Sequence, residues 1–341
     1  MRFSVLRQPH HNHTQCMYLM RGDGHLMIRY VVNRVLRSFL SVFIIICIVF
    51  ILLRLLPVEG YFGGRYDLLT EEQRQTELYR MGLLDPIPVQ LFNFLRQLFF
   101  DFDMGLSMRI RVNVPVTQVI AERVPISLQF GLIAVAIGMP LGMALGVMMS
   151  RKKGGIWDKA GTGYVAILNA VPAPVYMVLI QLYGTMILSA PLTFRFDSPV
   201  SRILPILTMC LPIIAINAFW MRRYMVDEIN KDYIKLAKIK NVPNTTIFFR
   251  HVFRNAVVPM TNLIPLSILG TIWGQIIIER LYSIPGMGGL LVDAILARDN
   301  ALVQALVIVF STVGIFGLLL GDLLMAFVDP RIRLHKKGAA R

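Results

Sequence analysis

The chain lacks the residue patterns on which most catalytic sites depend. It contains no Gly-Lys dipeptide and no Lys followed by Ser or Thr, so it cannot build the common phosphate-binding loop. No carboxylate pair, Cys/His metal-ligand spacing or nucleophile motif stands out. The three cysteines include Cys47 and Cys210, which lie in apolar blocks, and this excludes a disulfide framework. We therefore expect no catalytic residue, cofactor or metal ion in this chain.

Charged residues are also scarce, at 16% of the chain, whereas 55% of the residues are hydrophobic. The hydrophobic residues gather in blocks of about 20 or more, which is the length that crosses the hydrocarbon of a bilayer. The formal net charge of +15 could suggest nucleic acid, but the placement of the charges argues against it. These features predict an all-α polytopic membrane protein that is surrounded by lipid and binds no nucleic acid.

Apolar segments predict six transmembrane helices, at about residues 36–56, 126–149, 164–188, 203–221, 257–278 and 302–328. Prolines inside such helices are tolerated where the freed carbonyls face protein or a water-filled cavity, which favours a transporter over a simple anchor. Gly138, Gly142 and Gly146 recur every fourth residue and predict a small-residue face for close helix packing.

The remaining segments divide the chain into regions. Residues 1–26 are polar and aperiodic and predict a tail, either disordered or an upstream extension; metal binding by its histidines is the less favoured interpretation. The other expected regions are the first transmembrane helix at 27–56, an extracytoplasmic loop with short helices at 57–117, a core with five transmembrane helices at 118–332 and a basic cytoplasmic tail at 333–341. In the loop, Thr70-Glu-Glu-Gln73 predicts a capped helix that ends near Gly82.

The lysines predict the orientation. With six crossings, all nine fall in segments that share one side: Lys152, Lys153, Lys159, Lys231, Lys235, Lys238, Lys240, Lys336 and Lys337. By the positive-inside rule this side is the cytoplasm, so both termini are predicted to be cytoplasmic. The first apolar block is too long for a cleavable signal peptide and has no small-residue cleavage site. We expect a multi-pass protein of the cytoplasmic membrane.

The longest polar run between two apolar segments covers residues 221–259. Ile229, Tyr233, Leu236 and Ala237 recur at helical spacing and predict an amphipathic helix whose other face is basic. After that helix, Asn241 is expected in the left-handed conformation.

Pro243 follows two residues later, which also indicates a helix end before it. Asn244 is expected to cap a second helix that runs towards Pro259. A helix, a sharp turn and a second helix form a rigid object on the membrane surface. We expect a soluble partner to bind it.

Few polar groups lie inside the predicted spans. Glu279 and Asp322 are the acidic ones, and each is either a group that couples transport to an ion gradient or a structural group bonded to neighbouring helices. Uncharged polar residues that either line a pathway or bond between helices are Asn169, Gln181, Asn217, Asn262 and Gln275.

Two parts of the polar run, Asp232–Asn241 and Arg250–Pro259, resemble the coupling loop (EAA loop) of ABC-importer permeases. The closest similarity is to the oligopeptide/dipeptide branch of that family. Further segments similar to that branch follow in the same order: Gly82–Gln90, Gly105–Ser107, Pro115–Val116 with Arg123–Pro125, Glu279 with Pro285–Gly288, Ala297–Asp299 and Asp329–Ile332. The resemblance covers nearly all of the chain from Met27.

The resemblance implies a type I ABC-importer permease fold and a coupling loop at 222–258 that docks on a cytoplasmic ATPase. Lys235, Leu236 and Ala237 stand at the Glu-Ala-Ala positions and Asn241 at the glycine, so a salt bridge through a Glu is not assumed. The coupling residues implied are Tyr233, Lys235, Leu236, Ala237, Lys240, Asn241 and Pro243.

The resemblance also implies a function and its partners. It describes a transport subunit, not an enzyme, that moves oligopeptides or dipeptides with a second homologous permease, two ATPase subunits and an extracytoplasmic binding protein. Related branch members carry nickel, glutathione or other small solutes, which stay open as substrates. The rival classes are an ion-coupled secondary transporter that uses Asp322 or Glu279 and a membrane scaffold that transports nothing.

Overall fold

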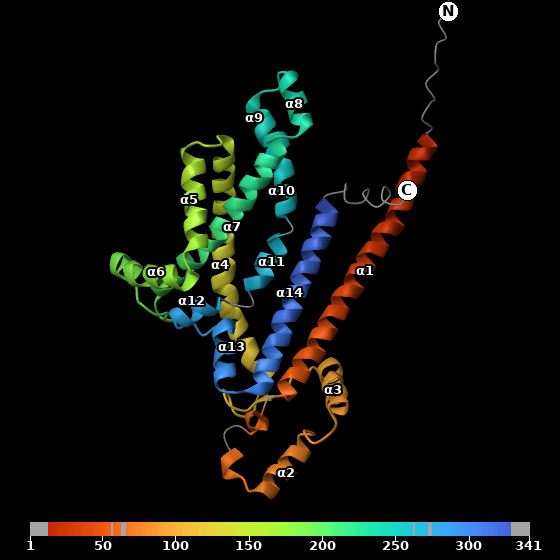
Figure 1. Ribbon diagram of the computed structural model, residues 1–341, viewed down its shortest axis with the longest axis vertical. Coiled ribbons are helices and arrows are strands. Elements are labelled where there is room, and N and C mark those ends of the chain that lie inside the picture. The colour runs from red at the N-terminus through yellow and green to blue at the C-terminus, as the bar shows by residue number, and fades with distance from the viewer. Residues whose placement is uncertain (1–12, 56, 63–65, 262, 272–274, 329–341) are drawn as a thin grey trace, which may run out of the picture.

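The computed structural model describes residues 13–55, 57–62, 66–261, 263–271 and 275–328, and over these residues it is helical apart from one short hairpin (Figure 1). Four helical segments in this part are long and apolar enough to cross a membrane: Val31–Arg54, Val116–Arg151, Pro199–Ile229 and Asn300–Leu324. Two bent helix pairs also qualify, so the described residues hold six candidate spans if each pair is one span.

The α-helices are α1 (His13–Arg54), α2 (Glu71–Arg80), α3 (Ile87–Arg96), α4 (Val116–Arg151), α5 (Ile156–Ala170), α6 (Ala173–Leu188), α7 (Ile203–Ile229), α8 (Asp232–Ile239), α9 (Asn244–Thr246), α10 (Arg254–Met260), α11 (Leu263–Gly270), α12 (Ile276–Leu281), α13 (Met287–Leu296) and α14 (Asn300–Val328). The short elements are η1 (Val58–Tyr61), η2 (Tyr66–Leu68), η3 (Gln97–Asp101), η4 (Pro199–Arg202), η5 (Ile247–Phe253), β1 (Leu106–Ser107) and β2 (Val114–Pro115). The segments η3 and η5 are π-helical.

The long helices run between two ends of the molecule, which we call the α8 end and the α2 end after the helices that lie there (Figure 1). Helices α1 and α14 pack side by side and antiparallel, and Arg34 of α1 forms an ion pair with Asp322 of α14. Helix α1 begins at His13, so part of the tail expected to lack structure is helical. Residues 1–12 and the tail at 333–341 lie outside the described residues.

Among the described residues, helices α4 and α7 make the most extensive contact between two helices, and three glycines of α4 explain it. A Cβ added to Gly142 would lie 2.6 Å from the carbonyl oxygen of Ile214, and one added to Gly146 would lie 2.7 Å from that of Ala218. A Cβ on Gly138 would lie 2.9 Å from Cγ2 of Ile213. The predicted small-residue face is confirmed, and its role is to let two helix backbones approach each other.

The third predicted span is not one straight helix. Helix α5 ends at Ala170 and α6 starts after Pro172, with an angle of 107° between them. Val171 is extended (φ −85°, ψ 127°) because the ring of a following proline disfavours the helical conformation in the residue before it. The prolines noted in the sequence therefore turn the chain rather than kink a single span.

The fifth predicted span is also wrong in its extent. The helical stretch Asn244–Met260 is followed by α11 at an angle of 45°, and the described helix ends at Gly270. Residues 276–278, expected at the end of this span, belong to the separate short helix α12. Helix α12 lies near α6 and the start of α7, across the direction of the long helices (Figure 1).

The α2 end is built from the loop between α1 and α4. Thr70 caps α2 through Gln73 in the reciprocal pattern predicted from the sequence, and Gly82 after the helix has φ +64°. The aromatic ring of Phe94 in α3 stacks on Phe50 of α1, with 5.1 Å between centroids. This stacking attaches α3 to the end of the first span.

A buried carboxylate connects this loop to α14. Asp299, which is fully buried just before α14, accepts hydrogen bonds at Oδ2 from the Ser107 hydroxyl (2.6 Å) and from the backbone N–H groups of Met108 (3.1 Å), Arg109 (3.0 Å) and Ile110 (3.1 Å). Its Oδ1 accepts from the N–H of Leu302 at 3.3 Å. Two segments that are 192 residues apart therefore meet around one charge.

Candidate functional site

The first candidate site is the tip of the molecule at the α8 end, where α8 and α9 extend beyond α5 and α10 (Figure 1). Helix α7 ends at Ile229, and Lys231 is extended (φ −68°, ψ 148°) before α8 begins at Asp232. The prediction of one helix through Ile229 and Ala237 is therefore wrong. The break lets α8 turn away from the α7 axis and lie across the tip.

The turn after α8 has the conformation predicted from the sequence. Asn241 has φ +56°, its N–H donates to Lys238 O (3.0 Å), and the N–H of Val242 donates to Ala237 O (3.1 Å). These two bonds form a Schellman motif, in which the residue after the helix is left-handed. Pro243, with φ −55° and ψ 135°, holds the N-cap position of α9. Asn244 is the first helical residue, so the prediction that it is the cap is wrong.

The two faces of α8 have different environments. Ile234 is buried, and Ala237 and Val242 pack with it against an apolar cluster that includes Met221, Met225, Ile247, Val252, Ala256 and Met260. On the other side, Tyr233, Leu236 and Ile239 are 39%, 52% and 77% exposed. These three residues, which we call the α8 strip, present apolar surface outwards.

Polar contacts hold α8 in place. Tyr233 donates its hydroxyl proton to Glu228 of α7, and the Asn255 amide of α10 donates to Glu228 Oε1 (3.1 Å) and to the Tyr233 oxygen (2.8 Å). This network joins three helices. Asn255 was not among the residues singled out from the sequence, although it lies in the segment 250–259 that carries the resemblance.

The lysines of the predicted coupling set point outwards. Lys235 forms an exposed ion pair with Asp232 at 2.8 Å, and the hydrogen bond from its ammonium lowers the pKa of the Asp232 carboxyl. Lys240 is exposed at the end of α8. The Glu-Ala-Ala positions thus separate in the structure, because Lys235 and Leu236 face outwards while Ala237 packs inwards.

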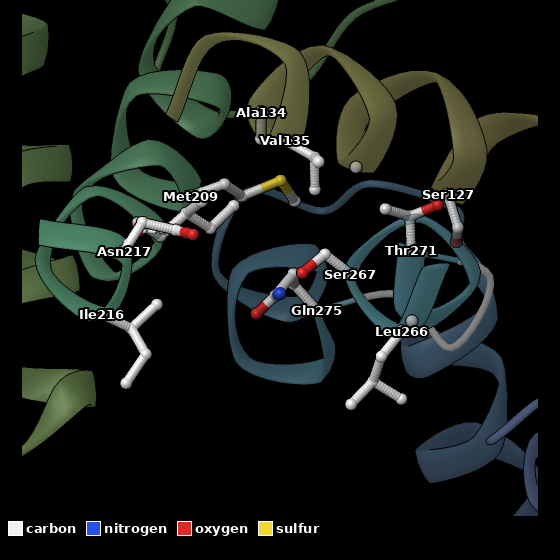
Figure 2. A pocket seen from close by; sticks show the side chains of 13 residues that line it. Ser127, Ala134, Val135, Met209, Ile216, Asn217, Leu266, Ser267, Thr271 and Gln275 are labelled. Carbon is white, nitrogen blue, oxygen red and sulfur yellow. Dashed lines mark hydrogen bonds between the residues drawn. The ribbon is translucent and has the colours of Figure 1, made fainter. Parts of the chain in front are cut away.

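The second candidate site is a cavity of about 220 Å³ between α4, α7 and α11 (Figure 2). It brings together two of the predicted pathway residues, Asn217 and Gln275. Asn217 is 3% exposed and donates to the carbonyl of Ile213 at 2.8 Å, while its Oδ1 has no hydrogen-bond partner among the described residues. The described residues that line the cavity carry no formal charge.

Three small polar residues of the cavity were not predicted: Ser127, Ser267 and Thr271. Their side chains lie along the same hollow as Gln275 (Figure 2). Serine and threonine are common inside membrane helices as packing residues. No signal in the sequence distinguished these three.

The other predicted pathway residues do not reach the cavity. Asn169 is exposed and donates to Val165 of its own helix. Gln181 is buried and donates to the carbonyls of Leu192 (2.9 Å) and Leu281 (2.8 Å), so it connects α6 with α12. Asn262 lies outside the described residues.

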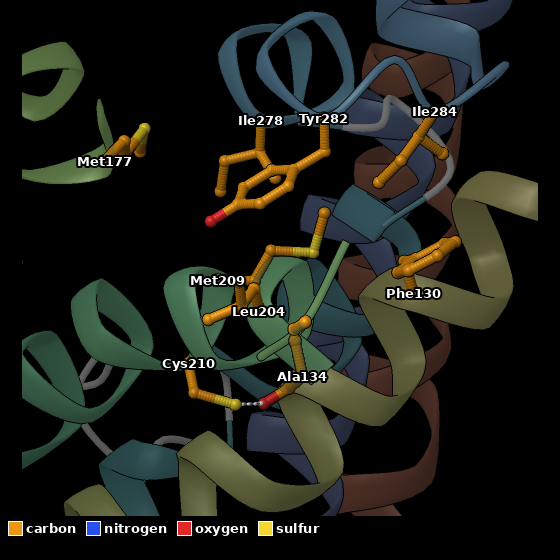
Figure 3. Packing of buried hydrophobic residues seen from close by; sticks show 10 residues of the cluster. Phe130, Ala134, Met177, Leu204, Met209, Cys210, Ile278, Tyr282 and Ile284 are labelled. Atoms are coloured by element: carbon orange, nitrogen blue, oxygen red, sulfur yellow. Dashed lines mark hydrogen bonds between the residues drawn. The ribbon is translucent and has the colours of Figure 1, made fainter. Parts of the chain in front are cut away.

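An apolar cluster closes one side of the cavity and shares Ala134 and Met209 with it (Figure 3). The cluster joins α4, α7 and α12, and the Tyr282 hydroxyl within it lies 2.9 Å from the Thr208 hydroxyl. The Cys210 thiol donates to the carbonyl of Ala134. These contacts position the wall of the cavity without adding a charge to it.

The two acidic residues predicted inside spans have structural partners. Glu279 is 1% exposed and accepts hydrogen bonds from the Ser127 hydroxyl (2.8 Å) and from the N–H groups of Gly289 (3.0 Å) and Gln275 (3.3 Å). A Cβ on Gly286 would collide with this carboxylate. Asp322 is ion-paired with Arg34. Both groups are engaged in contacts between elements.

Comparison with known families explains this arrangement. Residues 138–334, more than half of the chain, match the family model described as binding-protein-dependent transport system inner membrane component. The chain belongs to this family. It is thus a membrane-embedded transport permease with the all-α type I importer fold, and the resemblance seen in its sequence is confirmed.

Individual relatives match over most of this permease. It is 30% identical over 309 residues to the dipeptide transport system permease protein DppB of Lactococcus lactis, a match that covers 90% of this chain and 100% of the relative. The same figures apply to the oligopeptide transport system permease protein OppB of Salmonella typhimurium. The oligopeptide transport system permease protein AmiC of Streptococcus pneumoniae is 36% identical over 211 residues, which cover 61% of this chain and 42% of the relative.

Proposed function

We propose that this permease carries dipeptides or oligopeptides across the cytoplasmic membrane, driven by separate ATPase subunits that dock on the α8 strip. The observation that supports docking is an apolar strip, Tyr233, Leu236 and Ile239, exposed on a tip that packing and hydrogen bonds hold rigid. The chain has no phosphate-binding loop of the common type, so a partner supplies ATP hydrolysis. The named relatives are the reason for choosing peptides.

In the assembly that we propose, the α8 end and both termini are cytoplasmic. The lysine distribution supports this orientation. A second homologous permease pairs with this chain, two ATPase subunits bind at the α8 ends, and an extracytoplasmic binding protein delivers substrate at the α2 end. Nucleotide-driven movement of the ATPases would be transmitted through α8 and the Glu228–Tyr233–Asn255 network to α7 and α10.

We place the cavity beside Asn217 on the transport route. Its uncharged lining suits solutes of varied net charge, because a fixed charge would favour peptides of the opposite sign. Asn217 Oδ1 has no hydrogen-bond partner in the part of the chain that the structure describes, and we assign it as an acceptor for a peptide N–H. The ion-coupled alternative has less support, since Asp322 is paired with Arg34 and Glu279 already accepts three hydrogen bonds.

The docking proposal is tested with Leu236→Asp and Ile239→Asp in the assembled transporter. Each change places a charge in the proposed apolar contact. Loss of a hot-spot residue costs ~2 kcal/mol of binding free energy, so we expect the affinity of the permease for the ATPase to fall about thirtyfold and less ATPase to co-purify. Peptide uptake into proteoliposomes should fall with it. Ile156→Asp is the matched control, because Ile156 is 85% exposed at the start of α5 and outside the strip.

Normal ATPase binding by both strip variants would overturn the docking surface. The substrate is tested separately in the wild-type transporter with its binding protein, by uptake of a labelled dipeptide against unlabelled oligopeptide, nickel ion or glutathione. Competition by peptides supports the proposal. If the transporter takes up nickel ion or glutathione but no peptide, the peptide assignment is wrong and that solute is the substrate.

A further inference from the structure

A second cavity, of about 370 Å³, lies at the α2 end between the end of α1, the end of α2 and α3. Three arginines line it, Arg54, Arg80 and Arg96, together with one acidic residue, Asp101. Nothing in the proposed transport cycle uses this cavity. Arg80 is ion-paired with Glu77 at 3.2 Å, so Arg54 and Arg96 supply the excess of positive charge, which makes an anion the natural ligand.

Two aromatic rings hold Arg54 in a fixed position at this cavity. Its guanidinium carbon lies 4.7 Å from the centroid of the Phe50 ring and 5.0 Å from that of Tyr61. Nε and Nη1 are buried and have no hydrogen-bond partner among the described residues. A planar, positioned guanidinium with free N–H donors is suited to a phosphate or carboxylate.

Gln90 adds an acceptor to the same cavity. It is 8% exposed, and its amide Nε2 donates to the carbonyls of Leu83 (3.1 Å) and Asp85 (2.7 Å), which fixes the orientation of the side chain. Its Oε1 is buried and has no partner among the described residues. A ligand that satisfies the cavity therefore combines an anionic group with a hydrogen-bond donor.

The surroundings of the cavity favour a lipid as its source. Arg54 is the last residue of the first candidate span, so the cavity lies where hydrocarbon gives way to headgroups. The adjoining segment of α3 and η3 exposes Phe92 and Phe99, which are 67% and 53% exposed, and Phe100 and Phe102 are 80% and 79% exposed. Exposed aromatic side chains on an amphipathic segment at this depth are typical of interfacial helices.

We propose that this cavity binds the headgroup of a phospholipid that carries both a phosphate and a hydrogen-bond donor, such as phosphatidylethanolamine or phosphatidylglycerol. Arg54 and Arg96 hold the phosphate oxygens. Gln90 Oε1 accepts from the headgroup ammonium or hydroxyl. The bound lipid attaches the loop at 57–117 to the membrane surface while the phenylalanines of α3 and η3 enter the acyl boundary.

The test is lipid retention by the full-length transporter, purified from nanodiscs of phosphatidylethanolamine, phosphatidylglycerol or phosphatidylcholine and measured by native mass spectrometry. We expect wild type to retain the first two about tenfold more strongly than phosphatidylcholine, whose quaternary ammonium donates no hydrogen bond. Arg96→Gln alone, and with Arg54→Gln, should reduce that retention about tenfold or more. Arg96 is exposed, so we expect the Arg96→Gln variant to fold. This single variant can therefore decide the test even if the double variant does not fold.

Arg195→Gln is the matched control, because Arg195 is exposed and lies outside the cavity. Equal retention by wild type and the Arg96→Gln variant would overturn the proposal. If inorganic phosphate displaces the lipid, the cavity is a site for a free anion and the lipid proposal is wrong. If the variants keep their lipid but lose affinity for the extracytoplasmic binding protein, the cavity binds an acidic protein side chain instead. Peptide uptake is scored separately and does not decide any of these outcomes.

Discussion

Asn241 determines the direction in which the chain leaves α8, since it holds φ +56°, a conformation that few residues with a side chain adopt. Asparagine reaches it at modest cost, and glycine at none. The Schellman hydrogen bonds to Ala237 and Lys238 depend on this single residue. The φ angle of Asn241 therefore helps to fix the orientation of the α8 strip, and substitutions at this residue can test it.

The effect of a substitution at Asn241 should depend on the free-energy cost of a positive φ for the new residue. We expect Asn241→Gly to keep peptide uptake, whereas Asn241→Val should destabilise the turn by about 1–2 kcal/mol, because a β-branched side chain disfavours positive φ. The measurements are uptake into proteoliposomes and ATPase co-purification. Strong loss of uptake in Asn241→Gly would contradict the left-handed turn as the determining feature.

Ala237 shows how the structure changes the meaning of a sequence motif. The resemblance places it among the docking residues, yet it packs inwards with Ile234 and Val242. We expect Ala237→Asp to abolish uptake and to lower the melting temperature of the purified protein, because it buries a charge. Leu236→Asp should lower uptake and leave that temperature unchanged. Equal melting temperatures for the two variants would contradict this assignment.

At the scale of the elements, the α4–α7 contact depends on glycines that lie where the two helix backbones approach each other. Gly142→Ala would place Cβ 2.6 Å from the carbonyl oxygen of Ile214, and both helix backbones would have to separate. We expect a loss of about 1–3 kcal/mol in unfolding free energy, the usual cost of overpacking. Thermal unfolding of the purified protein measures it.

Gly163→Ala is the control for this contact, since a Cβ there meets nothing within 4 Å. At this half-buried helical position with open space around the added Cβ, the change from glycine to alanine should stabilise by up to about 1 kcal/mol. Opposite signs for the two variants are the expected result. Similar effects at both positions would indicate that helix propensity, and not the close approach of α7, determines the outcome.

At the scale of the whole molecule, Asp299 joins the loop before α4 to the start of α14. Asp299→Ala would remove the acceptor of the buried Ser107 hydroxyl and of three partly buried backbone N–H groups, and each polar group left unsatisfied costs about 1–3 kcal/mol. We expect the loop to detach and the rate of limited proteolysis within residues 57–117 to rise. Asp197→Asn, at an exposed site, should leave that rate unchanged. Unaltered proteolysis of Asp299→Ala would show that other contacts hold the loop.

Much of the fold could be predicted because its signals are local. The capped start of α2, the left-handed residue after α8 and the small-residue face of α4 each depend on a few neighbouring residues. The first, second, fourth and sixth candidate spans agree with apolar length, which the bilayer thickness imposes on any helix. Family membership followed from short segments in a fixed order.

The contacts that build the sites could not be predicted in the same way. Ser107 meets Asp299 across 192 residues, and Ser127 meets Glu279 across 152, because helices pack them together and not because of any local pattern. Periodicity placed Ala237 and Leu236 on one face, but the break after Ile229 reoriented α8, so that Ala237 packs inwards while Leu236 is exposed. Sequence alone determined the family and most of the helical segments, but not where α7, α5 and α11 end. The tertiary structure decided which side chains are exposed at the tip and which line the two cavities, since those directions depend on how distant elements pack.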